Sequence, residues 1–196
     1  GSEMCIRDSD SNANYAWILH ILSHLKKTDG VAGFLLANGA LNDSDTLEIR
    51  KELIQNDKIE AIVVLPRELF ITTDISVTLW ILNQNKKGGK YHGRNLRNRE
   101  HEILFMDLRQ WTENAVKGES KKKVRLDTEQ VEKAADIYHT WQCEGTDGAD
   151  YEMPELYRSV CINEIESKGW ALTPSKYIEF IDHDLDIDYE KEMTRI

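Results

Sequence analysis

Two histidines have the spacing of a zinc site on a helix. His20 and His24 stand four residues apart, so a helix would bring both rings to one face. Such a site also needs a third ligand, and a hydrolytic site needs a glutamate between the histidines, but neither follows nearby. We therefore predict no metal site and assign the two histidines to a polar helix face.

The three cysteines, Cys5, Cys143 and Cys161, lie far apart and form no C-x-x-C pair. This spacing argues against both a zinc site and a disulfide framework, and it favours a reducing, cytoplasmic location. No apolar run approaches the roughly 20 residues of a membrane helix, and no signal-peptide pattern opens the chain. We therefore expect no membrane association.

Phe70 is a large apolar ring in a polar loop. An exposed apolar surface of this kind favours a partner that covers it, such as a flat ligand. Alternatively, the ring closes the edge of a sheet or packs on Leu69 and Ile71.

A second candidate site is the glycine-containing basic loop over residues 86–99. Its cations could contact the phosphates of a nucleic acid, although loops of this composition are also common as solvated surface. The candidate phosphate contacts are Lys86, Lys87, Lys90, Arg94, Arg97 and Arg99.

These candidates require an α/β framework. Apolar periodicity predicts a helix over residues 14–27 that begins with Tyr15 and Trp17, and a second helix that follows acceptors at residues 43–45 and ends near residue 56. Continuous apolar runs predict strands over residues 31–37, 59–65 and 77–82, the first of them buried on both faces of a parallel sheet. The connection over residues 66–76 is too short for a crossover helix, so the third strand should run antiparallel to the second.

Asn38 directly follows the first predicted strand, at the end where open α/β sheets place their ligands. Asn38-Gly39 is also ordinary turn chemistry, so both interpretations stay open. Further along, we predict a strand over residues 102–108, a helix from Asp127 to Trp141 capped by Asp127 or Thr128, and a weaker helix over residues 155–167. Trp141, Trp111 and Trp170 should be core or subunit contacts.

Three segments follow from this pattern. Residues 1–10 have no periodicity and should lie outside the fold, as a remnant or a disordered segment. Residues 11–110 form half of a doubly wound sheet, and residues 111–196 form a mainly helical extension with an acidic tail. The net charge of -10 would repel a phosphate backbone over most of the surface, so partners must supply much of the positive charge needed to hold DNA.

Seven short blocks, in order, resemble the modification subunits of type I restriction-modification systems, which are N6-adenine DNA methyltransferases. They are residues 12–20 (NANYAWILH), 33–39 (GFLLANG), 48–51 (EIRK), 65–73 (LPRELFITT), 103–107 (ILFMD), 137–141 (IYHTW) and 169–177 (GWALTPSKY). The seven blocks occur in the order of the family and cover nearly all of the chain after the first ten residues.

The resemblance implies the C-terminal half of a Rossmann-like methyltransferase sheet. In the complete subunit, S-adenosylmethionine would donate a methyl group to the N6 atom of an adenine flipped out of the duplex. Phe70 matches the family position that stacks on this base, the helix that begins with Tyr15 and Trp17 flanks the cofactor pocket, and Asn38 lies beside that pocket. Core packing is the competing interpretation for Tyr15 and Trp17. The basic loop would contact phosphates beside the flipped base, and the expected partners are duplex DNA, a specificity subunit and a restriction subunit.

Two family segments are missing from this sequence. It has no cofactor loop, and its three prolines, Pro66, Pro154 and Pro174, cannot form the family's catalytic Asn/Asp-Pro-Pro-aromatic motif. We therefore expect no catalytic residue and no bound cofactor in this chain, and we predict that the chain alone is inactive. The alternative is a noncatalytic interaction module that binds the specificity or restriction subunit.

Overall fold

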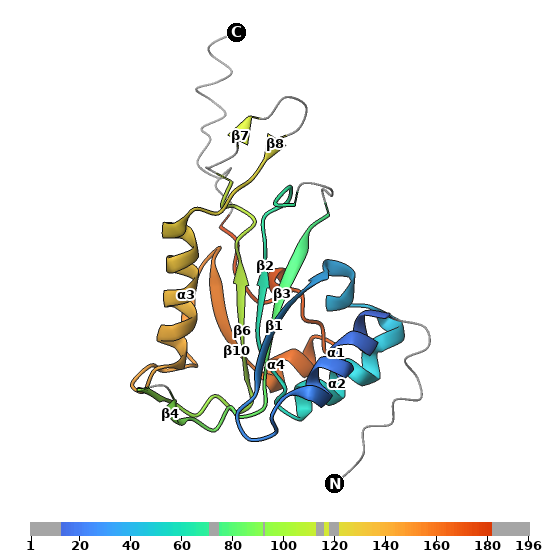
Figure 1. Ribbon diagram of the computed structural model, residues 1–196, viewed down its shortest axis with the longest axis vertical. Coiled ribbons are helices and arrows are strands. Elements are labelled where there is room, and N and C mark those ends of the chain that lie inside the picture. Colours follow the sequence, from blue (N-terminus) through green and yellow to red (C-terminus); the bar gives the residue numbers. More distant parts are fainter. Residues whose placement is uncertain (1–12, 71–74, 92, 113–115, 118–121, 182–196) are drawn as a thin grey trace, which may run out of the picture.

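The structure is a computed structural model that describes residues 13–70, 75–91, 93–112, 116–117 and 122–181. A six-stranded sheet has the order β1-β3-β2-β6-β10-β9 (Figure 1). Its strands are β1 (Val31–Ala37), β2 (Ile59–Val64), β3 (Val77–Asn83), β6 (Glu102–Asp107), β9 (Glu152–Met153) and β10 (Tyr157–Cys161). Two hairpins lie outside this sheet: β4 (Gly89–Tyr91) with β5 (Arg94–Leu96), and β7 (Val116–Lys117) with β8 (Lys122–Lys123).

Strand β3 lies between β1 and β2 and is antiparallel to both, as predicted for the strand that follows the short connection. Strands β2 and β6 form a parallel pair, and β10 runs antiparallel to β6. The carboxyl ends of β1, β2 and β6 therefore meet at one edge of the sheet. The amino end of β3 lies at the same edge.

The prediction that β1 is buried on both faces in a parallel sheet is wrong. β1 is an edge strand with an antiparallel neighbour, and its residues alternate between exposed and half-buried. Val31 and Leu35 are 43% and 45% exposed, and both point to the same face because side chains alternate along a strand. An apolar run alone does not distinguish a central strand from an edge strand.

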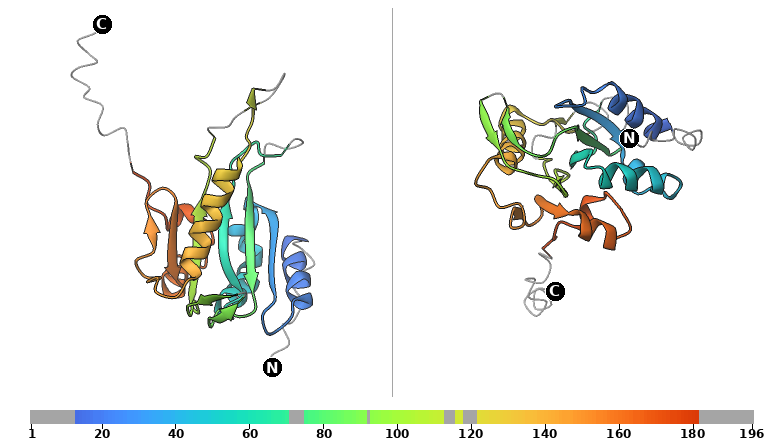
Figure 2. Two further views of the ribbon diagram at one scale, coloured as in Figure 1. Left: turned by 60° about the vertical axis from the view of Figure 1, so that its left-hand side comes forward. Right: turned by 90° about the horizontal axis from the view of Figure 1, so that it is seen from below.

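Helices cover both faces of the sheet (Figure 2). One face packs against α1 (Ala13–His24), α2 (Leu47–Gln55) and α4 (Ile162–Ser167) through a core that includes Trp80 and Phe105. The other face packs against α3 (Thr128–Gln142) around Trp141. Three short 3-10 helices, η2 (Asn38–Leu41), η3 (Ser44–Thr46) and η4 (Pro174–Lys176), complete the fold. No helix in the described part of the chain is long and apolar enough to cross a membrane.

The predicted helix over residues 155–167 is wrong in its first half. Residues Tyr157–Cys161 form β10, which pairs with β6, and only Ile162–Ser167 form a helix. Pairing with β6 is a long-range contact that local helix periodicity does not report. The sheet therefore includes strands on both sides of residue 110 in the sequence. Residues 111–196, expected to be a mainly helical extension, supply α3, α4 and the sheet strands β9 and β10.

Candidate functional site at the carboxyl edge of the sheet

Asn38 begins η2 directly after β1, at the carboxyl edge of the sheet. Its side-chain oxygen accepts a hydrogen bond from the Thr78 hydroxyl at 2.6 Å, and its backbone N–H donates to the carbonyl of Ser76 at 3.4 Å. These contacts fix Asn38 against the start of β3. The turn interpretation is therefore confirmed by η2, and a hydrogen bond from Asn38 to a ligand stays a prediction.

A shallow cavity of about 470 Å³ opens at this edge. Its described lining residues are Asn38, Arg67, Ile75, Ser76 and Arg109. The Ser76 hydroxyl is buried and has no hydrogen-bond partner within the described residues. Buried polar atoms normally have a partner, so this hydroxyl marks the cavity as a place where a polar group could bind.

Arg109 and Asp107 form a bidentate ion pair beside this cavity. Arg109 Nε lies 2.9 Å from Asp107 Oδ1, and Nη2 lies 2.5 Å from Oδ2. The hydrogen bonds from Arg109 to Asp107 raise the pKa of Arg109, although partial burial opposes this shift. Asp107 is buried, and the guanidinium of Arg109 balances its charge.

The described edge residues do not by themselves fit S-adenosylmethionine. A nucleoside cofactor is commonly held by an acidic side chain on its ribose hydroxyls and by a glycine-rich turn. The described lining of the cavity includes no acidic residue, and Asp107 is committed to Arg109. These residues can contribute one wall of a site but not a complete cofactor pocket.

Phe70 lies after β2 on the loop that returns to β3, at the same edge of the sheet. The ring is half-buried and is not part of either core cluster, whereas its neighbour Leu69 packs against the α3-side core. Ile71, the other neighbour proposed to cover the ring, lies outside the described residues. The structure therefore brings Phe70 and Asn38 to one edge.

Tyr15 is fully buried, in agreement with the core interpretation. Its hydroxyl donates to the carbonyl of Ala40 at 2.8 Å, and its ring meets Trp80 edge to face. Tyr15 thus supports the turn that carries Asn38 and has no surface with which to touch a ligand directly. Trp17 is 61% exposed, so the core interpretation for that residue is wrong.

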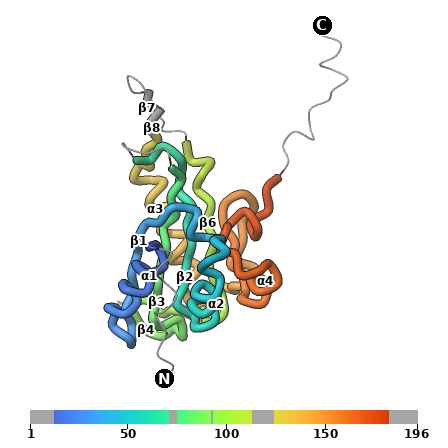
Figure 3. Tube along the Cα trace, turned by 90° about the vertical axis from the view of Figure 1, so that its right-hand side faces the viewer, coloured from blue at the N-terminus to red at the C-terminus, as the bar shows by residue number. Residues whose placement is uncertain are grey.

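The basic loop lies at the opposite end of the sheet. It follows the carboxyl end of β3, whereas Phe70 and Asn38 lie near the amino end of that strand. Strand β4 accordingly lies at the lower end of the sheet in Figure 3. A strand of seven residues is roughly 20 Å long, so a phosphate bound by this loop would not lie beside a base stacked on Phe70.

Three of the six candidate cations are already paired with carboxylates. Lys86 Nζ is buried 3.0 Å from Asp57, Arg97 Nη2 lies 2.7 Å from Glu102, and Arg99 Nε lies 2.9 Å from Glu60. Burial lowers the pKa of Lys86, and the charge of Asp57 opposes that shift. These side chains hold the loop to the sheet. Lys87 and Lys90 are exposed and Arg94 is half-buried, so these three are the cations placed to meet a phosphate.

Glu60 is the important polar residue that the sequence analysis missed. It is fully buried, and it accepts hydrogen bonds from four side chains on three other parts of the fold. The donors are Arg99 Nε at 2.9 Å, Gln142 Nε2 at 3.1 Å, Asn83 Nδ2 at 2.5 Å and the Tyr138 hydroxyl at 3.0 Å. The available signal was an acidic residue within the otherwise apolar run of β2.

A sequence profile of the N-6 DNA methylase family matches residues 4–185. The chain belongs to this family. The HindI methylase subunit of Haemophilus influenzae is 35% identical over 171 residues, which cover 85% of this chain and 34% of that protein. The MjaIX methylase subunit of Methanocaldococcus jannaschii is 31% identical over 185 residues, which cover 94% of this chain and 30% of that protein. Within the family, the chain is thus similar to type I methylase subunits, and it spans about a third of the length of these relatives.

Solved structures share the fold. The methyltransferase subunit of a type I system from Streptococcus thermophilus aligns with a TM-score of 0.66 at 22% identity, over 86% of this chain and 31% of that chain. The EcoKI M protein aligns with a TM-score of 0.59 at 14% identity, over 94% of this chain and 41% of that chain. These likenesses show that the chain shares the mixed α/β fold of these solved structures.

Proposed function

We propose that this chain forms the base-binding side of a site-specific DNA adenine-N6 methyltransferase, and that Phe70 stacks on an adenine flipped out of the duplex. The observation that carries the proposal is the position of Phe70, half-buried at the same edge of the sheet as Asn38 and the open cavity. A base that is modified must leave the helical stack, and an aromatic ring compensates for part of the lost stacking.

The open edge of the sheet supports docking of a further part of the subunit. Within the described residues β1 pairs with β3 alone, and Val31 and Leu35 are exposed on the same face. Natural proteins usually cover or protect a long apolar edge strand. Because the relatives are about three times as long as the matched region, we propose that a strand from the remainder of such a subunit pairs with β1.

The methyl donor of the complete subunit is proposed to be S-adenosylmethionine, bound mainly by residues that this sequence lacks. The three prolines are isolated, so no Pro-Pro motif is present to hold the adenine amino group. We therefore propose that the chain alone neither binds the cofactor nor methylates DNA. Calorimetric titration of the chain with S-adenosylmethionine tests this, and micromolar binding would contradict it.

Phe70→Ala in the complete subunit tests the stacking role. Stacking of a base on an aromatic side chain contributes about 1–3 kcal/mol, so methyl incorporation into duplex DNA should fall about tenfold or more. Phe70→Trp should retain most of the activity because it keeps a stacking surface. Val131→Ala is the control, since Val131 is an exposed apolar residue on α3 with no proposed role in the site.

A second readout separates stacking from folding. A fluorescent adenine analogue at the target position should report less base extrusion in Phe70→Ala, while the circular dichroism spectrum stays unchanged. Full methylation by Phe70→Ala would remove Phe70 from the site. In the assembled enzyme we propose that a specificity subunit, a restriction subunit and duplex DNA are the partners, with Lys87, Lys90 and Arg94 as contacts to DNA phosphates.

A further inference from the structure

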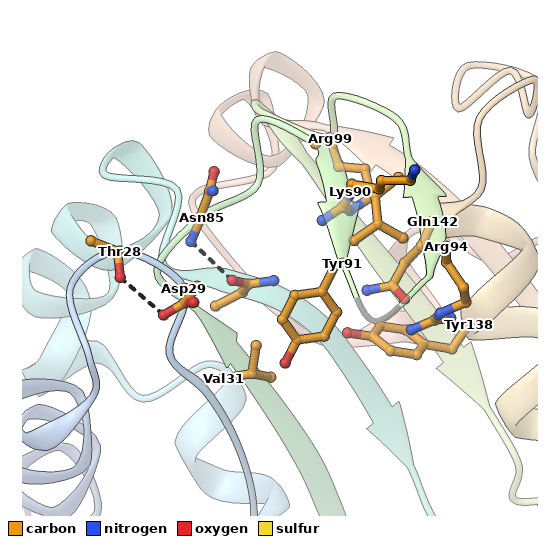
Figure 4. Close-up of a pocket in the computed structure, with 13 residues that line it drawn as sticks. Thr28, Asp29, Val31, Asn85, Lys90, Tyr91, Arg94, Arg99, Tyr138 and Gln142 are labelled. Carbon is orange, nitrogen blue, oxygen red and sulfur yellow. Dashed lines mark hydrogen bonds between the residues drawn. The ribbon is translucent and has the colours of Figure 1, made fainter.

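A cavity of about 440 Å³ lies beneath the β4–β5 hairpin, between the C-terminal end of α3 and the beginning of β1 (Figure 4). This volume falls within the range of small-molecule sites, roughly 300–1,000 Å³. The cavity lies at the opposite end of the sheet from Phe70. It is therefore separate from the proposed base-binding edge.

Three residues that line this cavity carry buried polar atoms without a hydrogen-bond partner in the described part of the chain. The atoms are Arg94 Nη1, Arg99 Nη2 and Gln142 Oε1. Arg99 is 0% exposed and Gln142 is 4% exposed, so bulk solvent cannot satisfy them freely. Buried polar groups are almost always hydrogen-bonded, and two donors and one acceptor around one space indicate a polar ligand.

The charges around the cavity favour an anion. Lys90, Arg94 and Arg99 line it, and Asp29 is the acidic residue among its lining side chains. Glu60 offsets Arg99 from behind, and Lys26 pairs with Asp29 at 2.8 Å. The remaining positive charge belongs to Lys90 and Arg94, in a chain whose net charge is -10. Guanidinium groups match the geometry of phosphate oxygens especially well.

Aromatic and amide groups surround the same space. Tyr91 and Tyr138 approach it from the hairpin and from α3, and Gln142 lies between them (Figure 4). A ring such as Tyr91 offers a stacking surface for a nucleobase, and the Gln142 oxygen can accept a hydrogen bond from a hydroxyl or amino group. A fully deprotonated inorganic anion has no hydrogen to donate to Gln142 Oε1, which has no partner among the described residues.

We propose that this cavity binds a nucleotide, with its phosphate on Lys90 and Arg94 and its sugar or base beside Tyr91 and Gln142. The nucleotide is either free or part of a DNA strand, and the two sources share this chemistry. The proposal deepens the phosphate contact proposed for the same loop. It does not depend on base stacking at Phe70, because the two sites lie at opposite ends of the sheet.

Calorimetric titration of the purified chain tests the proposal with three probes: inorganic phosphate, deoxyadenosine monophosphate and a duplex of about 12 base pairs. We expect the mononucleotide or the duplex to bind more tightly than inorganic phosphate. Arg94→Ala should weaken that binding about tenfold, the ordinary effect of removing one charge-assisted hydrogen bond. Lys27→Ala is the matched control, because Lys27 is an exposed lysine that precedes the cavity-lining residue Thr28 in sequence and does not line the cavity.

The outcomes separate the sources and the failures. Tight binding of the mononucleotide identifies a free nucleotide, whereas binding of the duplex alone identifies DNA. Absence of binding by all three probes at millimolar concentration overturns the proposal, and so does an equal loss in Lys27→Ala, which would indicate diffuse attraction. If Arg94→Ala fails to fold, Lys90→Ala replaces it, because Lys90 is exposed. Phe70→Ala should leave nucleotide binding unchanged, so failure of the methyltransferase proposal would be recognised separately.

Discussion

Replacing Glu60 by glutamine should destabilise the fold more than the same change at Glu102 or Glu164. Glu60 is fully buried on β2, and its carboxylate accepts hydrogen bonds from Arg99, Asn83, Tyr138 and Gln142. These donors belong to the loop before β6, to β3 and to α3. One side chain therefore ties α3 and the basic loop to the sheet.

The magnitude follows from the charge that the substitution leaves behind. Arg99 and Glu60 are both 0% exposed in their side chains, so Glu60→Gln leaves a buried guanidinium without its counter-ion. Breaking a buried ion pair in this way costs about 3–5 kcal/mol. The new amide N–H₂ group would also face some of the present donors. Total stabilities are about 5–15 kcal/mol, so this loss is a large part of the whole.

Urea unfolding followed by circular dichroism measures the effect. With a urea dependence of about 2 kcal/mol per molar, the midpoint should fall by about 2 M. Glu102→Gln is the matched control, because the side chains of Arg97 and Glu102 are 11% and 24% exposed, so water can partly replace the lost partner and the loss should be smaller than for Glu60→Gln. Adding Arg99→Met to Glu60→Gln should recover part of the loss, because no unpaired charge remains and the introduced amide oxygen can still accept a hydrogen bond.

Two results would refute this reasoning. One is a loss below about 1 kcal/mol for Glu60→Gln, equal to that of Glu102→Gln, since the buried charge would then be unimportant. The other is a double variant that is less stable than the sum of its two single variants predicts. That outcome would show that packing, rather than the unpaired charge, causes the loss.

Three further predictions concern the remaining polar contacts. Asp127→Ala removes the N-cap of α3 and should cost about 1 kcal/mol, measured by calorimetric unfolding; an unchanged Tm would contradict the capping role. Burial alone would raise the pKa of Glu164, but hydrogen bonds from Lys168 and Arg158 lower it below 4.5. The ionised Glu164 therefore stabilises the fold above about pH 4.5, and this contribution is lost as the pH falls through the lowered pKa. In Glu164→Gln the urea midpoint should depend less on pH in this acid range. An unaltered pH dependence of the midpoint would contradict this prediction. Burial and the charge of Arg94 lower the pKa of His139, so Arg94→Ala should raise that pKa in an NMR titration, and no change would show that the charge does not reach the ring.

Elements defined by local signals were predicted correctly. The helix α3 begins after Asp127, whose side chain forms a capping box with Gln130, and such a cap can be recognised from a few adjacent residues. Strand β2 was predicted from an apolar run that ends at Pro66. In the structure all its residues are buried. The antiparallel direction of β3 followed from the length of one connection, a property that the sequence contains directly.

Elements defined by their neighbours were not predicted. β1 has as apolar a sequence as a central strand, yet among the described residues it pairs with β3 alone and alternates between exposed and half-buried residues. Tyr157–Cys161 became a strand because the edge of β6 was available for pairing. Both outcomes depend on segments far away in the sequence, which local periodicity does not report.

The candidate site was predicted in part. Asn38 and Phe70 were both placed after strands, and the parallel β1 and β2 chain directions bring those strand ends to one edge. The basic loop was expected near the same edge, but β3 carries the chain to the other end before the loop begins. The prediction considered the loop's composition and did not follow the direction of the strand before it.

The basic loop also shows why a charge in the sequence is not always a charge available to a ligand. Lys86 binds Asp57, which lies just before β2, and Arg99 binds Glu60, the second residue of β2. The sheet places both carboxylates beneath the loop. Because a phosphate must compete with these buried, short-range partners, Lys86 and Arg99 stabilise the position of the loop and would contribute little to the DNA affinity that we propose. The affinity and its dependence on salt would therefore arise from Lys87, Lys90 and Arg94, whose release of counterions corresponds to about three phosphate contacts at most. Lys86 and Arg99 hold the loop to the sheet, and in our proposal Lys90 and Arg94 attract the ligand of the cavity beneath the hairpin.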